Sequence, residues 1–209
     1  MQLVIHCLPQ CGKAFVLCEI VQQVKVCSYA KGVLCKAVKA YKNEEEKEEN
    51  DDFLNTINTL EQVCKQSGRL EIEYKITSGI TLRNRFEVSD YKKSKINEVG
   101  FLAYQDLIYD PLQSKFSGNI RFAVFNTPGF DSRIYAYEND VLYSYSVLAY
   151  QHSGIRFYFN GRLQLRRDVD MWMKYSLSSY SNLDKIGSGL DEITGSHRSE
   201  IKLQFRYQF

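Results

Sequence analysis

The chain of 209 residues has few prolines, no long apolar run and almost no net charge, and its cysteines stop early. Of the three prolines, Pro111 and Pro128 flank proposed strands. No run of about 18 apolar residues occurs, which excludes a transmembrane helix. The net charge of +2 is too weak to indicate binding to nucleic acid or to a charged membrane surface. All six cysteines lie at or before Cys64, whereas residues 69–209 hold 13 of the 15 tyrosines and 10 of the 12 phenylalanines.

Residues 1–66 form a Cys-rich, acidic and partly helical amino-terminal region. The acidic run 44–52 indicates a solvated linker or the start of a helix. Apolar residues then recur at spacings of three and four, which predicts a short amphipathic helix over 53–66. The residues of this pattern are Phe53, Ile57, Leu60 and Cys64. A strand within 20–42 is an open alternative, with Val21 to Val26 as the candidate.

From Arg69 onward, apolar residues recur at every second position, as they do in strands with one apolar and one polar face. The pattern predicts seven strands, of which the third alternates poorly. They cover residues 69–77, 80–88, 99–109, 118–126, 154–166, 169–178 and 199–209. The last strand places Ile201, Leu203, Phe205, Tyr207 and Phe209 on one face and Lys202, Gln204, Arg206 and Gln208 on the other. We therefore predict an all-β antiparallel, barrel-like fold of about seven or eight strands over residues 69–209.

The polar faces of these strands are rich in basic side chains. They carry Arg83, Arg85, Arg121, Arg156, Arg162, Arg166, Lys174, Lys202 and Arg206, together with Glu71, Glu73, Glu87 and Asp170. Facing lipid near the bilayer midplane, each basic residue would cost about 2–4 kcal/mol, whereas in a wet lumen it can pair or hydrate. We expect these basic residues to face a lumen. The solvent face of a soluble antiparallel sheet is the alternative.

The expected connections between strands alternate in length. Short connections at 78–79, 110–117 and 167–168 alternate with long ones at 90–98, 127–153 and 179–198. Outer-membrane barrels show this alternation, because their periplasmic turns are short and their extracellular loops are long. With the carboxy-terminus in the periplasm, every short connection falls on the periplasmic side. The alternation therefore favours a barrel over a soluble sandwich.

Several stretches resemble one family. They are Arg133-Ile-Tyr-Ala-Tyr-Glu-Asn-Asp-Val-Leu-Tyr143, Gly154-Ile-Arg156, Ile186-Gly-Ser-Gly-Leu-Asp-Glu-Ile193 and the last strand. They look like the carboxy-terminal barrel segment of Gram-negative outer-membrane proteins that carry helix-hairpin-helix repeats and are labelled competence or DNA-uptake related. The resemblance covers roughly residues 69–209. It implies an outer-membrane location, and it implies outer-membrane lipid and the barrel-assembly machinery as partners.

In such barrels the last strand is also the assembly signal, a role that the resemblance implies for Phe205, Tyr207 and Phe209. The family's repeats are absent from this chain, so no nucleic-acid partner is carried over. Because single-chain bacterial barrels generally use an even number of strands, seven strands indicate a carboxy-terminal fragment of a larger barrel, completed by other copies or by its missing part. The first residues lack the basic segment of a signal peptide, which conflicts with an outer-membrane destination.

The long connection 127–153 is rich in tyrosine. It contains Tyr135, Tyr137, Tyr143, Tyr145 and Tyr150. Tyrosine-rich loops make good contact surfaces for saccharides, peptides or partner proteins, so these five are candidate binding residues. Two arrangements stay open, a plug that folds back into the lumen and a hairpin that extends above the membrane.

Weaker patterns point to chemistry that we do not expect here. His6 with Cys7 and Cys11 could hold zinc, and Asp184, Asp191 and Glu192 could attract calcium. His152 beside Ser153 and His197 beside Ser196 could form a loop active site, but no partner is nominated by spacing. Residues 186–190 could cradle a phosphate, although strands flank them. We expect no enzyme activity, no cofactor and no metal.

The sequence thus predicts a porin-like outer-membrane β-barrel segment with a pore, uptake or assembly role. An Arg-rich lumen would pass or bind an anionic solute, and the connection 127–153 would gate it. The alternative is a soluble or periplasmic antiparallel β-protein that binds a ligand through its Tyr-rich loop.

Overall fold

The computed structural model describes the backbone of residues 23–29, 33–47, 60–187 and 189–209, and the side chains of residues 62–187 and 189–209. Within these ranges the regular secondary structure is strand, apart from one short 3-10 turn, η1 (Gly189–Asp191). No helix in the same ranges has the length and apolar character needed to cross a membrane.

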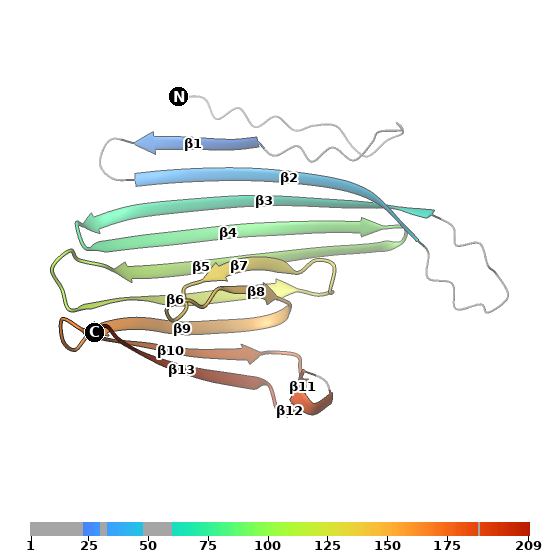
Figure 1. Ribbon diagram of the computed structural model, residues 1–209. Helices are drawn as coiled ribbons and strands as arrows, with labels where there is room; N and C mark the ends of the chain where they lie inside the picture. Colours follow the sequence, from blue (N-terminus) through green and yellow to red (C-terminus); the bar gives the residue numbers. More distant parts are fainter. Residues whose placement is uncertain (1–22, 30–32, 48–59, 188) are drawn as a thin grey trace.

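Nine antiparallel strands form a single meandering sheet (Figure 1). In spatial order they are β1 (Gln23–Tyr29), β2 (Val33–Lys47), β3 (Leu60–Thr77), β4 (Ile80–Lys93), β5 (Ile96–Tyr109), β6 (Phe116–Thr127), β9 (His152–Gln164), β10 (Val169–Tyr180) and β13 (His197–Tyr207). Each strand pairs with the next one in this order through an antiparallel ladder. Within the described part of the chain no ladder joins β1 to β13, so the sheet is open and these two strands are its edges.

Two small hairpins are inserted into this meander. β7 (Ile134–Glu138) pairs with β8 (Ser146–Tyr150), and β11 (Lys185–Ile186) pairs with β12 (Ile193–Thr194). The last residue of β6, Thr127, is the register partner of the first residue of β9, His152. The β7–β8 hairpin therefore leaves and re-enters the sheet at a single point.

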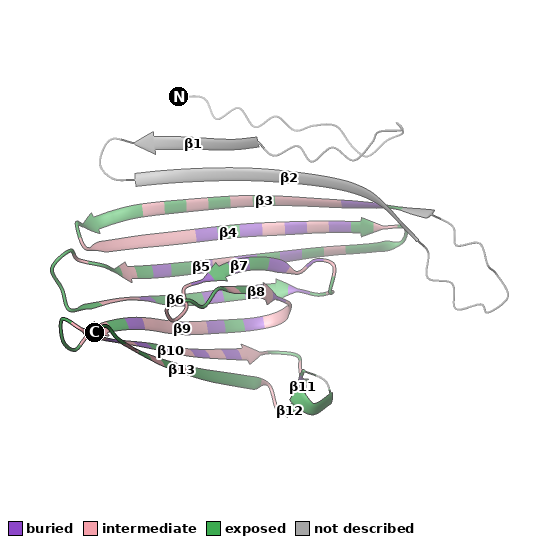
Figure 2. Ribbon diagram, viewed as in Figure 1, coloured by how far each residue is buried: buried purple, intermediate pink, exposed green. Residues whose placement is uncertain are grey.

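The two faces of the large sheet differ in chemistry, because side chains alternate along each strand. The apolar face is the one that carries large hydrophobic residues with exposed fractions between 36% and 65%. These residues are Leu70, Ile72, Tyr74, Phe86, Val99, Phe101, Leu107, Tyr109, Phe116, Ile120, Phe122, Val124, Ile155, Met173, Ile201, Leu203, Phe205 and Tyr207. The opposite, polar face carries most of the charged residues of these strands. Figure 2 shows the resulting alternation of buried and exposed positions along the central strands.

The β7–β8 hairpin lies over the polar face of β5 and β6 (Figure 1). A small hydrophobic core forms between the hairpin and the sheet. The sheet contributes Leu102, Tyr104, Ala123 and Phe125, and the hairpin contributes Ile134, Ala136 and Tyr150. The rings of Phe125 and Tyr150 meet edge to face at a centroid distance of 5.2 Å. Most buried hydrophobic packing in the described part of the chain is therefore under the hairpin.

The prediction of an all-β antiparallel fold, incomplete as a barrel, is confirmed. All seven expected strands are present as β3, β4, β5, β6, β9, β10 and β13. The open alternative of a strand within 20–42 also holds, since β1 and β2 occupy part of it. β3 crosses the expected boundary at residues 66–69 without interruption, so residues 60–66 continue the same sheet.

The expected helix over 53–66 is wrong where the structure describes it, because residues 60–66 belong to β3, and residues 53–59 lie outside the described residues. The acidic run is also misread in part, since its first residues, 44–47, end β2. These two segments pair with each other, with Glu44 opposite Val63 and Lys47 opposite Leu60. The ladder satisfies the backbone of both segments, and this tertiary pairing outweighs the local helical spacing.

The expected long connection at 90–98 is wrong. β4 runs to Lys93 and β5 begins at Ile96, which leaves a two-residue turn with Ser94 in a left-handed conformation (φ 48°). Left-handed residues are what a two-residue hairpin turn requires. The regular alternation of short and long connections therefore fails here. Of the two arrangements left open for 127–153, the structure has the hairpin folded back over the polar face.

Candidate functional site

A row of paired charges crosses the middle of the polar face from β3 to β6. Register places Glu73, Arg83, Asp106 and Arg121 side by side on successive strands. The Nη2 atom of Arg83 lies 2.9 Å from a carboxylate oxygen of Glu73. Arg121 donates to both oxygens of Asp106, from Nε at 2.6 Å and from Nη2 at 2.7 Å. Because Asp106 and Arg121 are both buried, this bidentate pair is held in a largely desolvated setting.

A second group of charges lies further along β3 and β4. Glu87 accepts from Arg69 at 3.0 and 3.1 Å and also pairs with Arg85. The guanidinium groups of Arg85 and Arg121 both lie over the ring of Tyr104, at 5.6 and 3.7 Å from its centroid. The sheet therefore neutralises these arginines with its own carboxylates and stacks them on an aromatic ring.

The β7–β8 hairpin brings one wholly buried carboxylate, that of Glu138, to the polar face. It accepts from Arg156 Nε at 2.7 Å and from Arg156 Nη2 at 2.8 Å, a fork-like bidentate contact. The hydroxyl of Tyr150 donates to it at 3.0 Å, and the ammonium of Lys174 lies 3.5 Å away. Glu138 is therefore the central anchor of the hairpin.

A second hairpin carboxylate, that of Asp140, lies between two lysines of the sheet. It accepts from Lys202 at 2.9 Å and from Lys174 at 3.2 Å, and its side chain is fully buried. Lys174 and Lys202 are register partners on β10 and β13. We call Glu138 and Asp140 the docking carboxylates, and we call Arg156, Lys174 and Lys202 the basic track.

The backbone of the hairpin is fastened to the same face. Arg121 donates to the carbonyl of Tyr137 at 2.7 Å, and Arg85 donates to the carbonyl of Tyr135 at 3.2 Å. Tyr158 accepts from a hairpin amide at 3.3 Å, and this tyrosine is completely buried. The polar face thus holds the hairpin through charge, backbone and packing together.

The pKa values of the hairpin groups follow from these contacts. Burial alone would raise the pKa of Glu138, but hydrogen bonding and charge from Arg156 and the charge of Lys174 outweigh it and hold this pKa below its ordinary value. The pKa of Asp140 is likewise lowered, because bonds from Lys202 and Lys174 outweigh its burial. Burial and the charge of Glu138 raise the pKa of Tyr150, so its hydroxyl remains a donor. Both docking carboxylates are therefore charged at neutral pH.

A third group lies near the turn between β9 and β10. Asp170 accepts from Arg162 at 3.0 Å and from Arg206 at 2.5 Å. The ring of Trp172 has the guanidinium groups of Arg162 and Arg206 at 5.5 and 5.3 Å from its centroid. The ion pairs of this group form within the sheet and do not involve the docking carboxylates.

Eight of the nine basic residues expected in a lumen lie on the polar face of the sheet. They are Arg83, Arg85, Arg121, Arg156, Arg162, Lys174, Lys202 and Arg206. Arg166 differs, because β9 ends at Gln164 and Arg166 lies in the following turn, where its amide donates to the carbonyl of Val169 at 3.2 Å. The expected carboxylates Glu73, Glu87 and Asp170 are partners of these cations.

The tyrosines of the hairpin region divide into two kinds. Tyr135, Tyr137, Tyr143 and Tyr145 are exposed, and the rings of Tyr137 and Tyr145 are 5.2 Å apart. Tyr150 is buried against the sheet, so it is a core and anchoring residue and not part of a contact surface. Phe205, Tyr207 and Phe209 are all exposed, although β13 ends at Tyr207.

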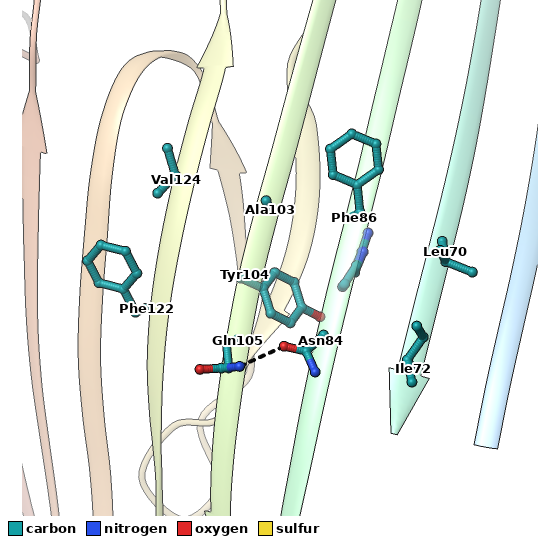
Figure 3. Close-up of a pocket in the computed structure, with 10 residues that line it drawn as sticks. Leu70, Ile72, Asn84, Phe86, Ala103, Tyr104, Gln105, Phe122 and Val124 are labelled. Atoms are coloured by element: carbon teal, nitrogen blue, oxygen red, sulfur yellow. Dashed lines mark hydrogen bonds between the residues drawn. The ribbon is translucent and has the colours of Figure 1, made fainter. Parts of the chain in front are cut away.

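In the described part of the chain, a pair of polar residues interrupts the middle of the apolar face. Asn84 and Gln105 are register partners on β4 and β5, and the Gln105 amide donates to the Asn84 oxygen at 2.8 Å. They border a hollow of about 410 Å³ above the small side chain of Ala103, with Phe86 and Phe122 on either side (Figure 3). The mutual hydrogen bond lowers the cost of placing two amides on an otherwise apolar surface.

Sequence reasoning missed Asp106 and both docking carboxylates. Asp106 was hidden because its strand alternates poorly, with Leu102 and Tyr104 on the polar face. That irregularity was itself the signal, since apolar residues on a polar face require a cover. Asp140 follows Glu138 by two residues, so an alternating acidic pair at the end of the β7 pattern was visible in the sequence.

The structure also places some residues of the weaker sequence patterns. No group of three His, Cys, Asp or Glu side chains in the described part of the chain is close enough to hold a metal ion. Asp184, Asp191 and Glu192 therefore do not form a calcium site there. The zinc candidates His6, Cys7 and Cys11 lie outside the described residues. His152 and His197 begin β9 and β13, and the ring of His152 lies near Tyr180.

Comparison with protein-family models, with curated proteins and with solved structures found no match to this chain. We therefore infer a function from the chemistry of the two faces and from the contacts of the hairpin.

Proposed function

We propose that this chain is an outer-membrane β-barrel segment with a pore or uptake role, in which the apolar face contacts lipid and the polar face lines a lumen. The β7–β8 hairpin is the plug of that lumen. The observation that carries the proposal is the distribution of side chains, because large hydrophobic residues are exposed on one face of the sheet while eight charged residues are buried and paired on or against the other face.

The apolar face is unusual for a sheet in water. Its exposed residues extend over β3, β4, β5, β6, β9, β10 and β13, and each of the seven strands contributes at least one of them. Soluble monomers rarely expose contiguous apolar patches larger than a few hundred Å². In a bilayer the same surface is matched to its surroundings, and these seven strands, of 11 to 18 residues, are long enough for a tilted crossing, which needs about 9–11 residues.

The polar face supports the complementary half of the proposal. Arg121, Arg156 and Lys174 are buried there, and each pairs with a carboxylate. Facing lipid at the midplane, such residues would cost about 2–4 kcal/mol each. In a lumen filled by the hairpin, the same three cations are paired with protein carboxylates, and they can also hold the plug in place.

Barrel closure is a requirement of the proposal, because an open sheet edge has unsatisfied backbone groups that lipid cannot hydrogen-bond. The edges β1 and β13 must pair with each other or with strands supplied by another copy or by the missing part of the barrel. The exposed Phe205 and Tyr207 on β13 are in the position that an assembly signal would occupy at a closing seam.

Extraction and heat-modifiable gel mobility test this proposal together. We expect the protein to stay with membranes through high salt and carbonate, to need detergent for release, and to run faster on a gel when unheated. The faster mobility would indicate a closed, SDS-resistant barrel. Release by carbonate together with unshifted mobility would contradict the proposal.

One observation favours a second function, that of a soluble or periplasmic β-protein that binds a ligand. The hairpin region exposes Tyr135, Tyr137, Tyr143 and Tyr145, and such aromatic groups suit contact with saccharides or peptides. If this second function is right, carbonate releases the protein from membranes. The double substitution Tyr137→Ala with Tyr145→Ala would then abolish binding of the ligand.

A further inference from the structure

We infer that the basic track is a binding site for polyvalent anions, and that the docking carboxylates occupy this site while the hairpin is in place. The ligand class is a molecule with at least two neighbouring carboxylate or phosphate groups. The inference rests on the proposed function in one respect, since the site must open to a water-filled lumen when the hairpin leaves.

The geometry of the track is that of an anion site. Arg156, Lys174 and Lys202 come from β9, β10 and β13, three adjacent strands, and converge on two carboxylates within 3.5 Å. Arg156 is itself fixed by a bond of 2.7 Å from its Nη1 atom to the hydroxyl of Ser178, so its fork is pre-oriented. The three cations of the basic track are therefore already arranged to bind two anionic groups before an external ligand binds.

The docking carboxylates differ from every other acid on this face in their origin. Arg83, Arg121, Arg162 and Arg206 pair with carboxylates of the sheet, so they stay neutralised wherever the hairpin is. Among the described residues, Arg156 and Lys174 form ion pairs only with the hairpin, and Lys202 adds one exposed sheet partner, Glu200 at 3.4 Å. Departure of the hairpin would thus leave clustered, uncompensated positive charge.

The ligand must be polyvalent because the hairpin presents two anions at once. Lys174 contacts both carboxylates, at 3.5 and 3.2 Å, so the two acidic groups are close neighbours. A single small anion would replace one docking carboxylate and leave the other bound. A molecule with several carboxylates, or one with several phosphates, would replace both and compete with the hairpin.

The hairpin can leave without breaking the sheet. Thr127 and His152 are register partners at its two ends, so the ladder between β6 and β9 is continuous beneath it. Ligand binding and hairpin docking are therefore mutually exclusive states of one site, and a polyvalent anion would favour the open state of the lumen.

The test uses the full chain, folded in detergent, with citrate as the polycarboxylate probe, tripolyphosphate as the polyphosphate probe and acetate as the monovalent probe. Glu138→Gln with Asp140→Asn removes the internal occupant without removing the cations. By calorimetry we expect this double variant to bind citrate or tripolyphosphate at least about tenfold more tightly than the wild type, equivalent to about 1.4 kcal/mol. Acetate should bind neither protein measurably, and the preferred probe identifies the acid class.

Two controls distinguish a specific anion-binding site from nonspecific attraction of the anionic probes to unpaired cations. Adding Lys174→Met and Lys202→Met to the double variant should abolish the gain. Asp170→Asn also frees two arginines, Arg162 and Arg206, but neither forms an ion pair with a docking carboxylate, so it should give no comparable gain. An equal gain in Asp170→Asn, or a gain that survives loss of the lysines, would overturn the inference.

A second variant guards against misfolding of the first. Replacing residues 128–151 by an Asn-Gly turn removes the whole hairpin between paired strand ends and should give the same gain in affinity. Absence of binding to both variants would overturn the inference, even if extraction and gel mobility support a barrel. Binding by a protein that carbonate releases from membranes would instead support the anion site and contradict the barrel.

Discussion

At the residue scale, the buried pair of Arg121 and Asp106 tests whether the polar face depends on mutual compensation of charge. Asp106→Asn leaves Arg121 buried without its bidentate partner, and we expect this to cost about 3–5 kcal/mol of unfolding free energy. Arg121→Met with Asp106→Leu removes both charges and should cost much less. Denaturant unfolding of the wild type and these two variants in detergent measures the difference. Equal losses in the single and double variants would contradict the paired arrangement.

Residue types on the polar face were predictable from the sequence, and their partners were not. Period-two spacing placed Arg121 and Arg156 on one face, because alternation is a local property of a strand. Their pairing with Asp106 and Glu138 depends on strand register and on the return of a distant hairpin, and neither is encoded locally. Tyr150 shows the limit clearly, since it was expected in a contact surface and is a buried anchor.

At the element scale, the β7–β8 hairpin should be released by acid. Glu138 and Asp140 have pKa values lowered in the folded protein, so their contribution to docking is complete above the ordinary carboxylate pKa, about 4. It is lost as pH falls through the lower folded values. Hydrogen exchange of residues 134–150 should therefore be slow at neutral pH and accelerate in acid below pH about 4.

The control for this prediction is Glu138→Gln with Asp140→Asn. The hairpin of this double variant lacks both titrating groups, so its exchange should be faster at neutral pH and should change less across the same acid range. Acceleration of equal size in both proteins would mean that other groups control docking.

Close approach of strands gives a second prediction at this scale. A Cβ atom on Gly118, in β6, would lie 2.6 Å from the carbonyl oxygen of Asn160 on β9, whereas one on Gly68, in β3, would meet nothing within 4 Å. Gly118→Ala should therefore destabilise the sheet by about 1–3 kcal/mol, and Gly68→Ala should be neutral or slightly stabilising. Matched unfolding curves distinguish the two. A harmless Gly118→Ala would show that β6 and β9 separate easily.

Elements were predictable where one periodicity dominated. The seven strands after residue 69 followed from alternation, whereas the expected helix over 53–66 ignored the pairing of β2 with β3. The poor alternation of 99–109 has the same kind of cause, because the hairpin covers Leu102 and Tyr104 and allows apolar residues on the polar face. Local spacing fails at the positions where distant segments contact each other.

At the scale of the whole molecule, the two faces of the sheet define opposite environments. The apolar face has no covering segment over most of its exposed residues in the described part of the chain, while the polar face is covered by its own hairpin. This is the reverse of a soluble sandwich, whose apolar faces pack inward. We therefore propose that lipid covers the apolar face.

Two neighbouring residues of β10 test this claim at a single depth. Trp172, the sole tryptophan, lies on the polar face and is 7% exposed, whereas Met173 lies on the apolar face and is 38% exposed. The double substitution Trp172→Phe with Met173→Trp moves the fluorophore by one residue along β10 and thereby from the polar face to the apolar face. The most direct measurement is quenching by brominated phosphatidylcholine after reconstitution. We predict strong quenching of the moved tryptophan and weak quenching of the natural one, and equal quenching or exclusion of both proteins from vesicles would contradict the account.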